Sequence, residues 1–384
     1  MKRVLVTAGP VYGPLDANKL VGNRIRGIWA CHFANYLAGR GHDATLLIAD
    51  IMQIPFDHMH PSVSILRHKG YPDYREKCHA FAPMVNGAVM AAAVVNWIPA
   101  KPYEGKMPTA GYKEGDIIDI PFMLAPHVIN EMKVLNPMLT LVGCKMLVGV
   151  DDKTLLDAAY GVLLKSRSNV VIANDLRNLQ RKLFVHQDQT MVEIDGDWDR
   201  FNEFLLQHIL DEHYRTEQVV SSEVPYTMDE LATARLRFDN IVSRHRQEFF
   251  QWKEMAFGSV AVRIGDSDMF LVSPREKGQY FKSPDAVIVC SIDNEKRIVE
   301  IAPSTNKATL NAPLLINHLQ AIRDRRLGPL SPGNHIIHAH RQLPGLTTVP
   351  HAPPGTVRDS VRPSLPEDFN IEGHGFVIVD RHLH

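Results

Sequence analysis

The sequence predicts an α/β protein in which a doubly wound parallel sheet is followed by a second α/β domain of shorter strands. Residues 3–8 form a continuous apolar run that enters the Gly9-Pro10 turn, as a buried strand of a parallel sheet does. A helical pattern over 27–39 ends at glycines, and the apolar run 44–49 predicts a second buried strand. Strand–helix–strand units of this kind bind ligands at the carboxyl ends of their strands.

The rest of the first half continues this alternation of strands and helices. Further strands are expected at 87–95, 139–143, 169–173 and 192–195, followed by an amphipathic helix at about 198–213. The chain becomes polar around 212–226, which indicates a domain boundary. We therefore expect a first domain over 1–216, a linker over 217–227 and a second domain over 228–384.

The second half has a different pattern, in which short strands dominate. A highly charged helix is expected at 228–252, and its charge run is interpreted as a solvated face. Residues 341–370 are rich in proline and predict a loop, for which a lid over a neighbouring site is a hypothesis. The other expected elements are strands at 258–263, 269–273, 286–290, 336–340 and 375–379 and a helix at 312–322.

Charge and composition argue against several classes of partner. The 384 residues include 42 basic and 43 acidic side chains, so no broad basic surface for nucleic acid or an anionic membrane is expected. The apolar segment 86–97 is too short to span a bilayer, and the first apolar run is too short for a signal peptide. We expect a cytoplasmic protein that acts on small molecules and binds neither nucleic acid nor membrane.

Three histidines form the most specific pattern of the second half. His338 and His340 alternate along an expected strand, so both side chains point to one face. His374 comes from a later segment and can complete three corners of a metal site, with the fourth left open for substrate or water. A catalytic zinc ion needs this arrangement.

The turn after the first strand is a second candidate site. Gly9-Pro10-Val-Tyr-Gly13 is neither a Gly-x-Gly-x-x-Gly fingerprint nor a P-loop, so it supports NAD or FAD binding only weakly. A glycine-bearing turn at this place can still hold phosphate through backbone N–H groups.

Ordered blocks of the first half carry a family resemblance. They are Val6-Thr-Ala-Gly-Pro10 with Pro14-Leu-Asp16 and Gly22-Asn23-Arg24, Ala91-Ala-Ala-Val-Val-Asn96-Trp97, Glu104-Gly-Lys106-Met-Pro-Thr109, Val142-Gly143 and Val170-Val-Ile-Ala-Asn174-Asp175. Over residues 1–215 the chain resembles phosphopantothenoylcysteine synthetase, the CTP-dependent ligase of coenzyme A synthesis, which implies a Rossmann-like fold. Members of that family activate a carboxylate with CTP as an acyl-cytidylate, release pyrophosphate and form an amide with an amine.

The resemblance implies roles for individual residues. Asn23 matches the asparagine that contacts the acyl intermediate, and Lys106 matches a mobile-loop lysine that neutralises phosphate charge. A lysine on a loop rich in glycine and proline is also a natural phosphate clamp, because phosphoryl chemistry depends on charge stabilisation. CTP is expected together with Mg²⁺. The implied nucleotide contacts are Gly9, Pro10, Ala92, Asn96, Lys106, Gly143, Cys144, Asn174 and Asp175.

Departures from the family pattern concern the substrate. Asn96 stands where the family has an acidic residue, and Cys144 stands where an aromatic residue is expected. Val11-Tyr12-Gly13 replaces a Thr-Arg-Glu sequence. The acyl substrate is therefore not expected to be phosphopantothenate, and turnover of the ligase is an open question.

The second half resembles a different family, the class II aldolase/adducin family, over residues 228–384. The matching blocks are Gly258-Ser259, Val272-Ser273-Pro274, Ser283-Pro-Asp285, the helix at Pro313, His338-Ala-His340 and His374-Gly375. The resemblance implies a central, mainly antiparallel sheet and Zn²⁺, or another divalent ion, bound by the three histidines. The ion would polarise a carbonyl or enediolate oxygen while an adjacent carbon–carbon bond breaks or forms. Contacts to substrate or phosphate are implied for Gly258, Ser259, Ser273 and Thr309.

One departure in this half concerns proton transfer. Asn311 occupies the position of the family's acid/base glutamate, and an amide cannot transfer a proton as a carboxylate does. Glu372 and Glu276 are candidate substitutes. Three interpretations stay open: a bifunctional ligase and lyase, an active lyase with a nucleotide-binding and dimerising first half, or a non-catalytic, adducin-like protein. The two resemblances together imply a homo-oligomer, either a dimer or a tetramer.

Overall fold

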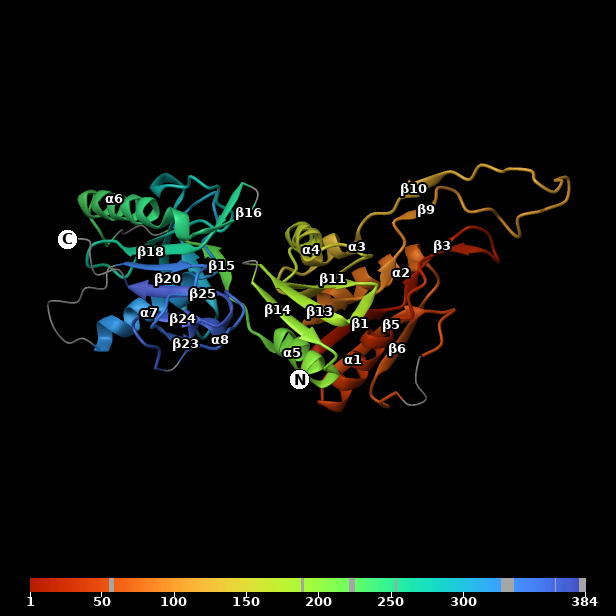
Figure 1. Cartoon of the computed structure of the whole chain (residues 1–384), viewed down its shortest axis with the longest axis horizontal. Coiled ribbons are helices and arrows are strands. Elements are labelled where there is room, and N and C mark those ends of the chain that lie inside the picture. Colours follow the sequence, from red (N-terminus) through yellow and green to blue (C-terminus); the bar gives the residue numbers. More distant parts are fainter. Residues whose placement is uncertain are drawn as a thin grey trace. The chain divides into compact units, whose positions relative to one another are not determined.

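The computed structural model describes residues 1–54, 59–187, 190–220, 225–252, 254–325, 335–362 and 364–379. The chain divides into two compact units, Met1–Leu210 and Asp211–His384, each with its own sheet and hydrophobic cores. In Figure 1 the first unit runs from red to green and the second from green to blue. Within the described ranges, no helix is both long enough and apolar enough to cross a membrane.

The first unit is organised around a sheet with the strand order β14-β13-β12-β11-β7-β1-β5-β6. Neighbours from β6 to β12 pair in parallel, and β13 and β14 extend one edge in antiparallel fashion. Chain order reverses between β1 and β7, which is the switch point where doubly wound sheets bind ligands. The predicted Rossmann-like class is confirmed. The strands are β1 (Arg3–Ala8), β5 (Asp43–Ala49), β6 (Ser64–His68), β7 (Gly87–Met90), β11 (Thr140–Leu147), β12 (Val170–Asp175), β13 (Asn178–His186) and β14 (Met191–Asp195).

Helices cover both faces of this sheet because its central strands are apolar on both faces (Figure 1). Along β1, Val4 and Val6 pack into one core with α1 and α5, whereas Leu5 packs into the opposite core with α2 and α3. This alternation is the two-residue period of an extended strand. The helices are α1 (Ile28–Gly39), α2 (Tyr71–Phe81), the 3₁₀ helix η1 (Ala82–Met84), α3 (Val128–Leu135), α4 (Asp152–Ser166) and α5 (Trp198–Leu210).

The strand predicted over 87–95 is interrupted in the structure. After β7 the chain leaves the main sheet, and β8 (Ala93–Val94) pairs in parallel with β2 (Pro10–Val11). The backbone N–H of Ala93 donates to the Gly9 carbonyl at 2.8 Å, so the break is produced by a partner more than eighty residues away. The chain after β7 therefore crosses the carboxyl end of β1.

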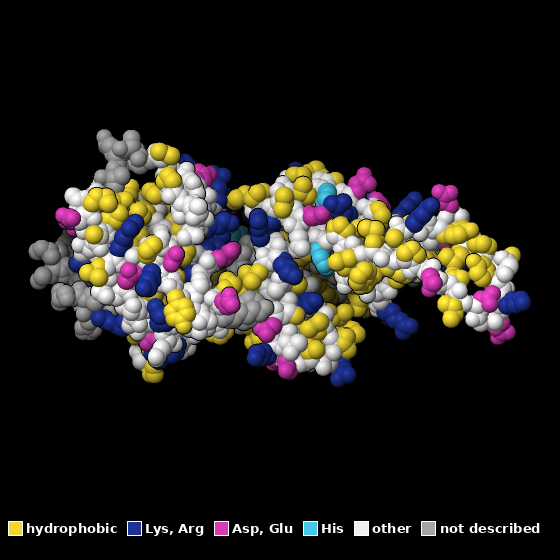
Figure 2. Space-filling model, turned by 90° about the horizontal axis from the view of Figure 1, so that it is seen from above, with side chains coloured by type: hydrophobic (Ala, Val, Ile, Leu, Met, Phe, Trp, Pro, Cys, Tyr) yellow, Lys and Arg dark blue, Asp and Glu magenta, His cyan; other side chains and the backbone are white. Residues whose placement is uncertain are grey.

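A long arm projects from the first unit between β9 (Trp97–Pro99) and β10 (Phe122–Leu124), which pair in antiparallel fashion (Figure 1). Its side chains Tyr112 and Ile117 are exposed, and Figure 2 shows hydrophobic side chains over this part of the molecule. The short strands β3 (Gly13–Pro14) and β4 (Leu20–Val21) form a hairpin in the same unit.

The second unit contains a sheet with the order β15-β21-β20-β19-β18-β22-β25-β24-β23. Its neighbours pair in antiparallel fashion except β15 with β21 and β23 with β24, so the predicted, mainly antiparallel sheet is confirmed. The strands are β15 (Arg215–Gln218), β18 (Ser259–Arg263), β19 (Phe270–Val272), β20 (Val287–Asp293), β21 (Ile298–Ile301), β22 (His335–Ala339), β23 (Thr347–Val349), β24 (Phe369–Ile371) and β25 (Gly375–Val379).

Two cores lie against this sheet. Phe238 of α6 packs into a core with Val260 and Ile337, and Leu315 of α7 packs into another core with Ala261 and Ile336. Alternate residues of β18 and β22 therefore face opposite cores. The remaining elements are α6 (Met228–His245), η2 (Arg246–Glu248), β16 (Phe250–Trp252), β17 (Met255–Phe257), η3 (Ser283–Asp285), α7 (Ala312–Arg325) and α8 (Val357–Ser360).

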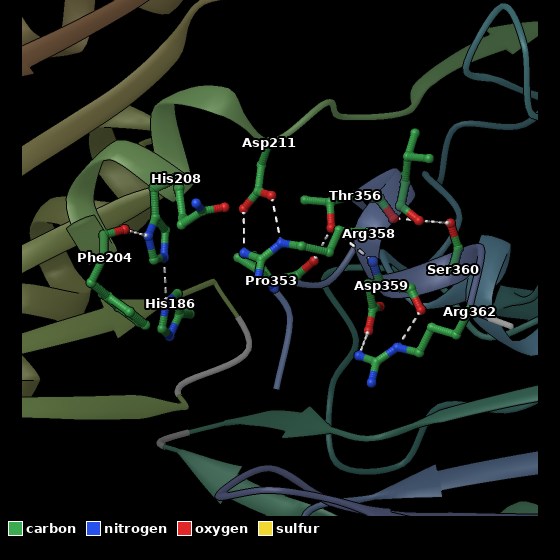
Figure 3. A network of polar contacts seen from close by, with 12 residues as sticks. His186, Phe204, His208, Asp211, Pro353, Thr356, Arg358, Asp359, Ser360 and Arg362 are labelled. Atoms are coloured by element: carbon green, nitrogen blue, oxygen red, sulfur yellow. Dashed lines mark hydrogen bonds and ion pairs between the residues drawn. The ribbon is translucent and has the colours of Figure 1, made fainter. Parts of the chain in front are cut away.

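Two sequence expectations differ from the structure in this unit. The helix predicted over 228–252 ends at His245, because the chain continues into η2 and the β16–β17 hairpin. The proline-rich segment 341–370 contains β23, α8 and the start of β24, so it is not a plain loop. Its α8 is tied to the start of the unit by Arg358, whose guanidinium donates to both carboxylate oxygens of Asp211 at 2.8 Å (Figure 3).

Candidate functional site

The first candidate site lies at the carboxyl end of β1. The Thr7 hydroxyl accepts a hydrogen bond from the Ala92 backbone N–H at 3.1 Å, which joins the ends of β1 and β7. Gly27 precedes α1 with a left-handed φ of 67°, and a Cβ there would lie 2.2 Å from the Gly9 backbone nitrogen. Glycine at 27 therefore lets the N-terminus of α1 approach the first turn closely. Backbone N–H groups of a helix start suit an anion at this place.

Asn23 and Ala92 are brought to the same turn. The Asn23 side-chain amide donates to the carbonyl oxygens of Ala93 at 3.1 Å and Val94 at 3.2 Å, directly after Ala92. Pro10 lies beside this segment through the pairing of β2 with β8. Asn96 follows two residues later and is exposed.

The loop that carries Lys106 is anchored on both sides of the lysine. The Gly105 carbonyl accepts from the Ala17 N–H at 2.9 Å, and the Met107 N–H donates to Asp16 Oδ2 at 3.0 Å. The Met107 N–H is the largest cause that holds the pKa of Asp16 well below its usual range. Lys106 itself is exposed, so its ammonium group is presented to solvent from a fixed backbone.

Asp16 stands within one of the matching sequence blocks, but no role was predicted for it. Its carboxylate also accepts from the N–H groups of Asn18 and Lys19, so it organises the tight turn after β3. The signal in the sequence was an aspartate followed by Ala-Asn, a pattern typical of Asx turns. We regard Asp16 as a positioning residue of the Lys106 loop.

The remaining nucleotide contacts implied by the resemblance divide into two groups. Gly143 and Cys144 lie on β11, directly after the residue that pairs with β7, and so are level with the end of β7. Asp175 is used differently. Its carboxylate accepts from the N–H groups of Gly149, Val150 and Arg177, and the Gly149 contact is the main cause that lowers its pKa. The carboxylate of Asp175 thus holds a turn, while Asn174 precedes it at the end of β12.

The three predicted histidines meet in the second unit. The ring centroids lie 5.1 Å apart for His338 and His340, 4.4 Å for His338 and His374, and 4.8 Å for His340 and His374. Their potential ligand atoms all lie within 4.8 Å of one another. His338 and His374 are buried and His340 is half-buried. Three neutral imidazoles so placed fit Zn²⁺ or a similar transition ion.

Strand pairing explains this convergence. His338 lies on β22 opposite Ser259 on one side and Val377 on the other, and His340 follows directly after the strand. His374 precedes Gly375, where a Cβ would lie 1.9 Å from the Ala339 carbonyl oxygen. Glycine at 375 therefore allows β25 to begin close against β22, which brings His374 to the other two rings.

Asn311 and the predicted phosphate contacts form one buried polar cluster beside His338. The Asn311 side-chain nitrogen donates to Ser259 Oγ at 3.1 Å and lies 3.3 Å from His338 Nδ1. Ser259 Oγ lies 2.7 Å from Thr309 Oγ1. Ser273 Oγ accepts from the Val260 N–H at 3.1 Å, in the strand next to it.

Gly258 and the two candidate glutamates complete the set of predicted positions. A Cβ at Gly258 would lie 2.3 Å from the Phe249 ring and 3.0 Å from the His338 carbonyl oxygen, so this glycine permits close packing behind the histidines. Glu372 is exposed two residues before His374, and Glu276 is exposed on the loop after β19. Among the described residues, neither carboxylate forms a hydrogen bond with Asn311, whose side chain lies beside His338 Nδ1.

Sequence reasoning also missed His351. Its ring centroid lies 5.6 Å from that of His374, and it belongs to the proline-rich segment for which a lid was hypothesised. The only sign of it in the sequence was a histidine beside Pro350 in that segment. Composition alone could not connect this residue to the three histidines. Phe250 adds an aromatic wall, because its ring stacks on His340 at 6.2 Å.

The fold and sites define a Rossmann-like domain and an α/β domain with a mainly antiparallel sheet that carries a cluster of three histidines. Residues 1–203 match the family model of the DNA/pantothenate metabolism flavoprotein C-terminal domain, and the chain belongs to this family. It is 34% identical over 119 residues to the coenzyme A biosynthesis bifunctional protein CoaBC of Mycolicibacterium smegmatis, covering 31% of this chain and 28% of that protein. It is 26% identical over 181 residues to CoaBC of Thermococcus kodakarensis, covering 46% of this chain and 42% of that protein. The chain thus spans less than half the length of these curated relatives.

Solved structures resemble each half separately. The DNA/pantothenate metabolism flavoprotein from Streptococcus pneumoniae aligns with a TM-score of 0.49 and 21% identity, covering 55% of this chain and 99% of that chain. The L-fuculose 1-phosphate aldolase from Glaciozyma antarctica aligns with a TM-score of 0.27 and 14% identity, covering 41% of this chain and 69% of that chain. These likenesses concern the fold alone.

Proposed function

We propose that the protein is a bifunctional enzyme in which the first unit is a CTP-dependent ligase and the second is a Zn²⁺-dependent lyase of the aldolase type. The ligase would activate a carboxylate as an acyl-cytidylate, release pyrophosphate and join the acyl group to an amine. The observation that carries this proposal most directly is the family match over residues 1–203. The histidine cluster supports the second activity.

In the ligase, the triphosphate of CTP, with Mg²⁺, would lie at the turn formed by Gly9 and Gly27. The free N–H groups at the start of α1 favour negative charge there. Lys106 would neutralise charge on the departing pyrophosphate, and Asn23 would contact the acyl group. Ala92, with Gly143 and Cys144, would contact the cytosine and ribose. Asn96 and Cys144 favour an acyl substrate other than phosphopantothenate.

In the lyase, His338, His340 and His374 would hold the divalent ion with one position open. The bound ion would supply Lewis-acid polarisation of a substrate carbonyl next to the carbon–carbon bond. Ser259, Ser273 and Thr309 offer hydroxyl groups to a polar or phosphorylated substrate. Phe250, whose ring stacks on His340, would form one wall of the substrate site.

Asn311 would act on the ring of His338 instead of transferring a proton. The Asn311 side-chain nitrogen lies 3.3 Å from His338 Nδ1. Turned over by 180°, the amide would instead accept the Nδ1–H through its oxygen and fix the tautomer whose Nε2 lone pair can bind a metal. The proton transfer then falls to another group, for which Glu372 is the candidate closest in sequence to the histidines. The reaction would differ from that of an enzyme with glutamate at 311.

A second candidate function retains only the metal lyase, with the first unit as a nucleotide-binding and dimerising scaffold. It is favoured by the amide at Asn96 and by the use of the Asp175 carboxylate to hold a turn. A non-catalytic, adducin-like role is the third candidate. In each case we propose a homo-oligomer. The exposed apolar side chains of the arm could be buried at an interface between its subunits.

The ligase proposal is tested by titrating the full-length protein with CTP and by measuring pyrophosphate release against a panel of carboxylates and amines. Lys106→Ala should abolish pyrophosphate release, whereas Lys113→Ala, on the same arm, should leave it unchanged. Binding of CTP without release for any substrate pair would favour the scaffold. If neither CTP nor another nucleotide binds, the ligase function is excluded.

The metal proposal is tested by elemental analysis of the purified protein. One divalent ion per chain is expected, and the double variant His338→Ala, His340→Ala should lose it. His127→Ala, an exposed histidine of the first unit, serves as the control and should keep it. Full metal content in the double variant would refute the site.

A further inference from the structure

A cavity in the second unit is lined in part by a buried lysine. The cavity has a volume of about 570 Å³ and is lined by Glu254, Pro274, Lys277, Tyr280, Phe281 and Asn306 among others. That volume is sufficient for a small organic ligand. The lining includes neither the three histidines nor Asn311, so the cavity is distinct from the candidate metal site.

Lys277 is 5% exposed and has few partners for a charged group. Its Nζ donates to the Pro274 carbonyl at 3.3 Å and lies 5.5 Å from the centre of the Phe281 ring. An ammonium group has three N–H donors, and a single long contact satisfies it poorly. Burial lowers the pKa of this amine to about 7.

Carboxylates are present in the cavity but do not pair with Lys277. Glu254, Glu276 and Asp285 line the cavity and are exposed. None of them forms an ion pair with Lys277 among the described residues. Their negative charge also disfavours a phosphate or carboxylate ligand at this place. The lining of the cavity therefore suits an uncharged or weakly polar ligand.

We propose that Lys277 is a nucleophilic amine that forms an imine with a small aldehyde or ketone bound in this cavity. A buried lysine in an apolar, unpaired setting is activated in this way because its free-amine form is favoured. The proposal does not depend on the ligase and lyase functions, since Lys277 has no role in either; Glu276 of the cavity wall is the one residue that was also a candidate for the lyase.

The reaction is balanced without an additional oxidant or reductant. The Lys277 nitrogen attacks the carbonyl carbon, and a carbon–nitrogen bond forms. The carbonyl oxygen leaves as water with the two protons of the amine. The exposed carboxylates of the cavity can accept and return these protons. The product is a reversible imine, which protonates to an iminium ion.

The test is reductive trapping with glycolaldehyde and sodium cyanoborohydride at pH 7, followed by peptide mass spectrometry of the full-length protein. Lys277 should be labelled at least about tenfold more than Lys307, because an ordinary lysine is almost entirely protonated at this pH. Lys307 is a matched control, since it is exposed and next to Asn306 of the cavity wall.

A substitution separates site-specific chemistry from general reactivity. Lys277→Met keeps the length and apolar character of the stem, so the fold should persist, as checked by circular dichroism. In this variant the excess labelling should disappear while labelling of Lys307 stays the same. Equal labelling of Lys277 and Lys307 in the original protein would overturn the proposal, as would excess labelling that appears only near pH 10.

Discussion

His186 and His208 share a hydrogen bond of 2.8 Å between their Nε2 atoms in the first unit (Figure 3). Both rings are buried, and their planes are nearly parallel. His208 Nδ1 lies 2.8 Å from the Phe204 carbonyl oxygen, to which it donates. Because a neutral imidazole has one donor and one acceptor, His208 Nε2 then accepts from His186 Nε2–H. The contact to β13 thus fixes one tautomer for each ring and fastens α5 to the sheet.

We predict that His208→Phe destabilises the protein by about 1–3 kcal/mol, because it leaves the buried donor of His186 without this acceptor. A phenyl ring preserves most of the volume and the stacking, so the loss reports the hydrogen bond. Urea unfolding followed by circular dichroism measures it. His127→Gln, at an exposed histidine, should be neutral, and equal stability of both variants would show that the pair contributes nothing.

A second prediction concerns acid stability and His68. This side chain is fully buried at the end of β6, and burial lowers its pKa from 6.5 to about 4. Between these values the unfolded chain binds a proton that the folded chain does not, so stability is complete above pH 6.5 and is lost as the pH falls toward 4. The loss is about 3 kcal/mol.

His68→Phe should flatten the pH dependence of the unfolding free energy in this window. Urea midpoints compared at neutral pH and near the lower end of the window measure the slope. His127→Gln should keep the slope of the original protein. An unchanged slope in His68→Phe would assign the acid sensitivity to other groups.

The turn before β25 yields a third prediction. Gly375→Ala should weaken Zn²⁺ binding at least about tenfold, because the new Cβ would overlap the Ala339 carbonyl oxygen and displace His374. Gly373→Ala is the matched control, since it has a positive φ of 64° but open space around its Cβ. It should cost about 1–2 kcal/mol of strain and retain the metal. Calorimetric titration with Zn²⁺ compares the two, and similar affinities would contradict the steric argument.

Asp16 provides the fourth prediction. Asp16→Ala removes the acceptor of the Met107 N–H, so hydrogen–deuterium exchange over residues 105–109 should accelerate by about tenfold or more. Asp116→Ala, which removes an acceptor near the tip of the same arm, should leave this peptide unchanged. An unaltered rate in Asp16→Ala would mean that the Gly105–Ala17 contact alone holds the loop.

The elements that sequence analysis recovered are those with local signals. The apolar runs of β1 and β5 and the helical spacing of α1 predicted a doubly wound parallel sheet. The interruption after β7 was not predicted, because it depends on the distant carbonyl of Gly9. No element was predicted for Tyr71–Phe81, whose charged sequence forms α2 against the apolar face of the sheet.

In the candidate sites, too, residues with local sequence signals were predicted and residues that act through distant contacts were not. His338 and His340 were predicted as one face because alternation along a strand is a local property. The contact of Asn311 with His338 required the fold, since β18, β22 and the residues before α7 meet only in three dimensions. Asp16 and His351 act through partners that no spacing rule connects to them. Tertiary contacts therefore supplied the surroundings of the sites, whereas the sequence indicated their central residues.

The parallel pairing of β15 with β21 has a practical consequence for dividing the chain. Arg215–Gln218 cover one margin of the second sheet, although sequence analysis expected a linker to begin at 217. A fragment that starts at residue 228 would leave the backbone groups of β21 open as a template for intermolecular strand pairing and aggregation. A fragment that starts at Asp211 keeps this shielding strand and the Asp211–Arg358 ion pair. The four residues of β15 thus protect the edge of the sheet from pairing with another molecule. Truncated or fused versions of the second unit should therefore begin before Arg215.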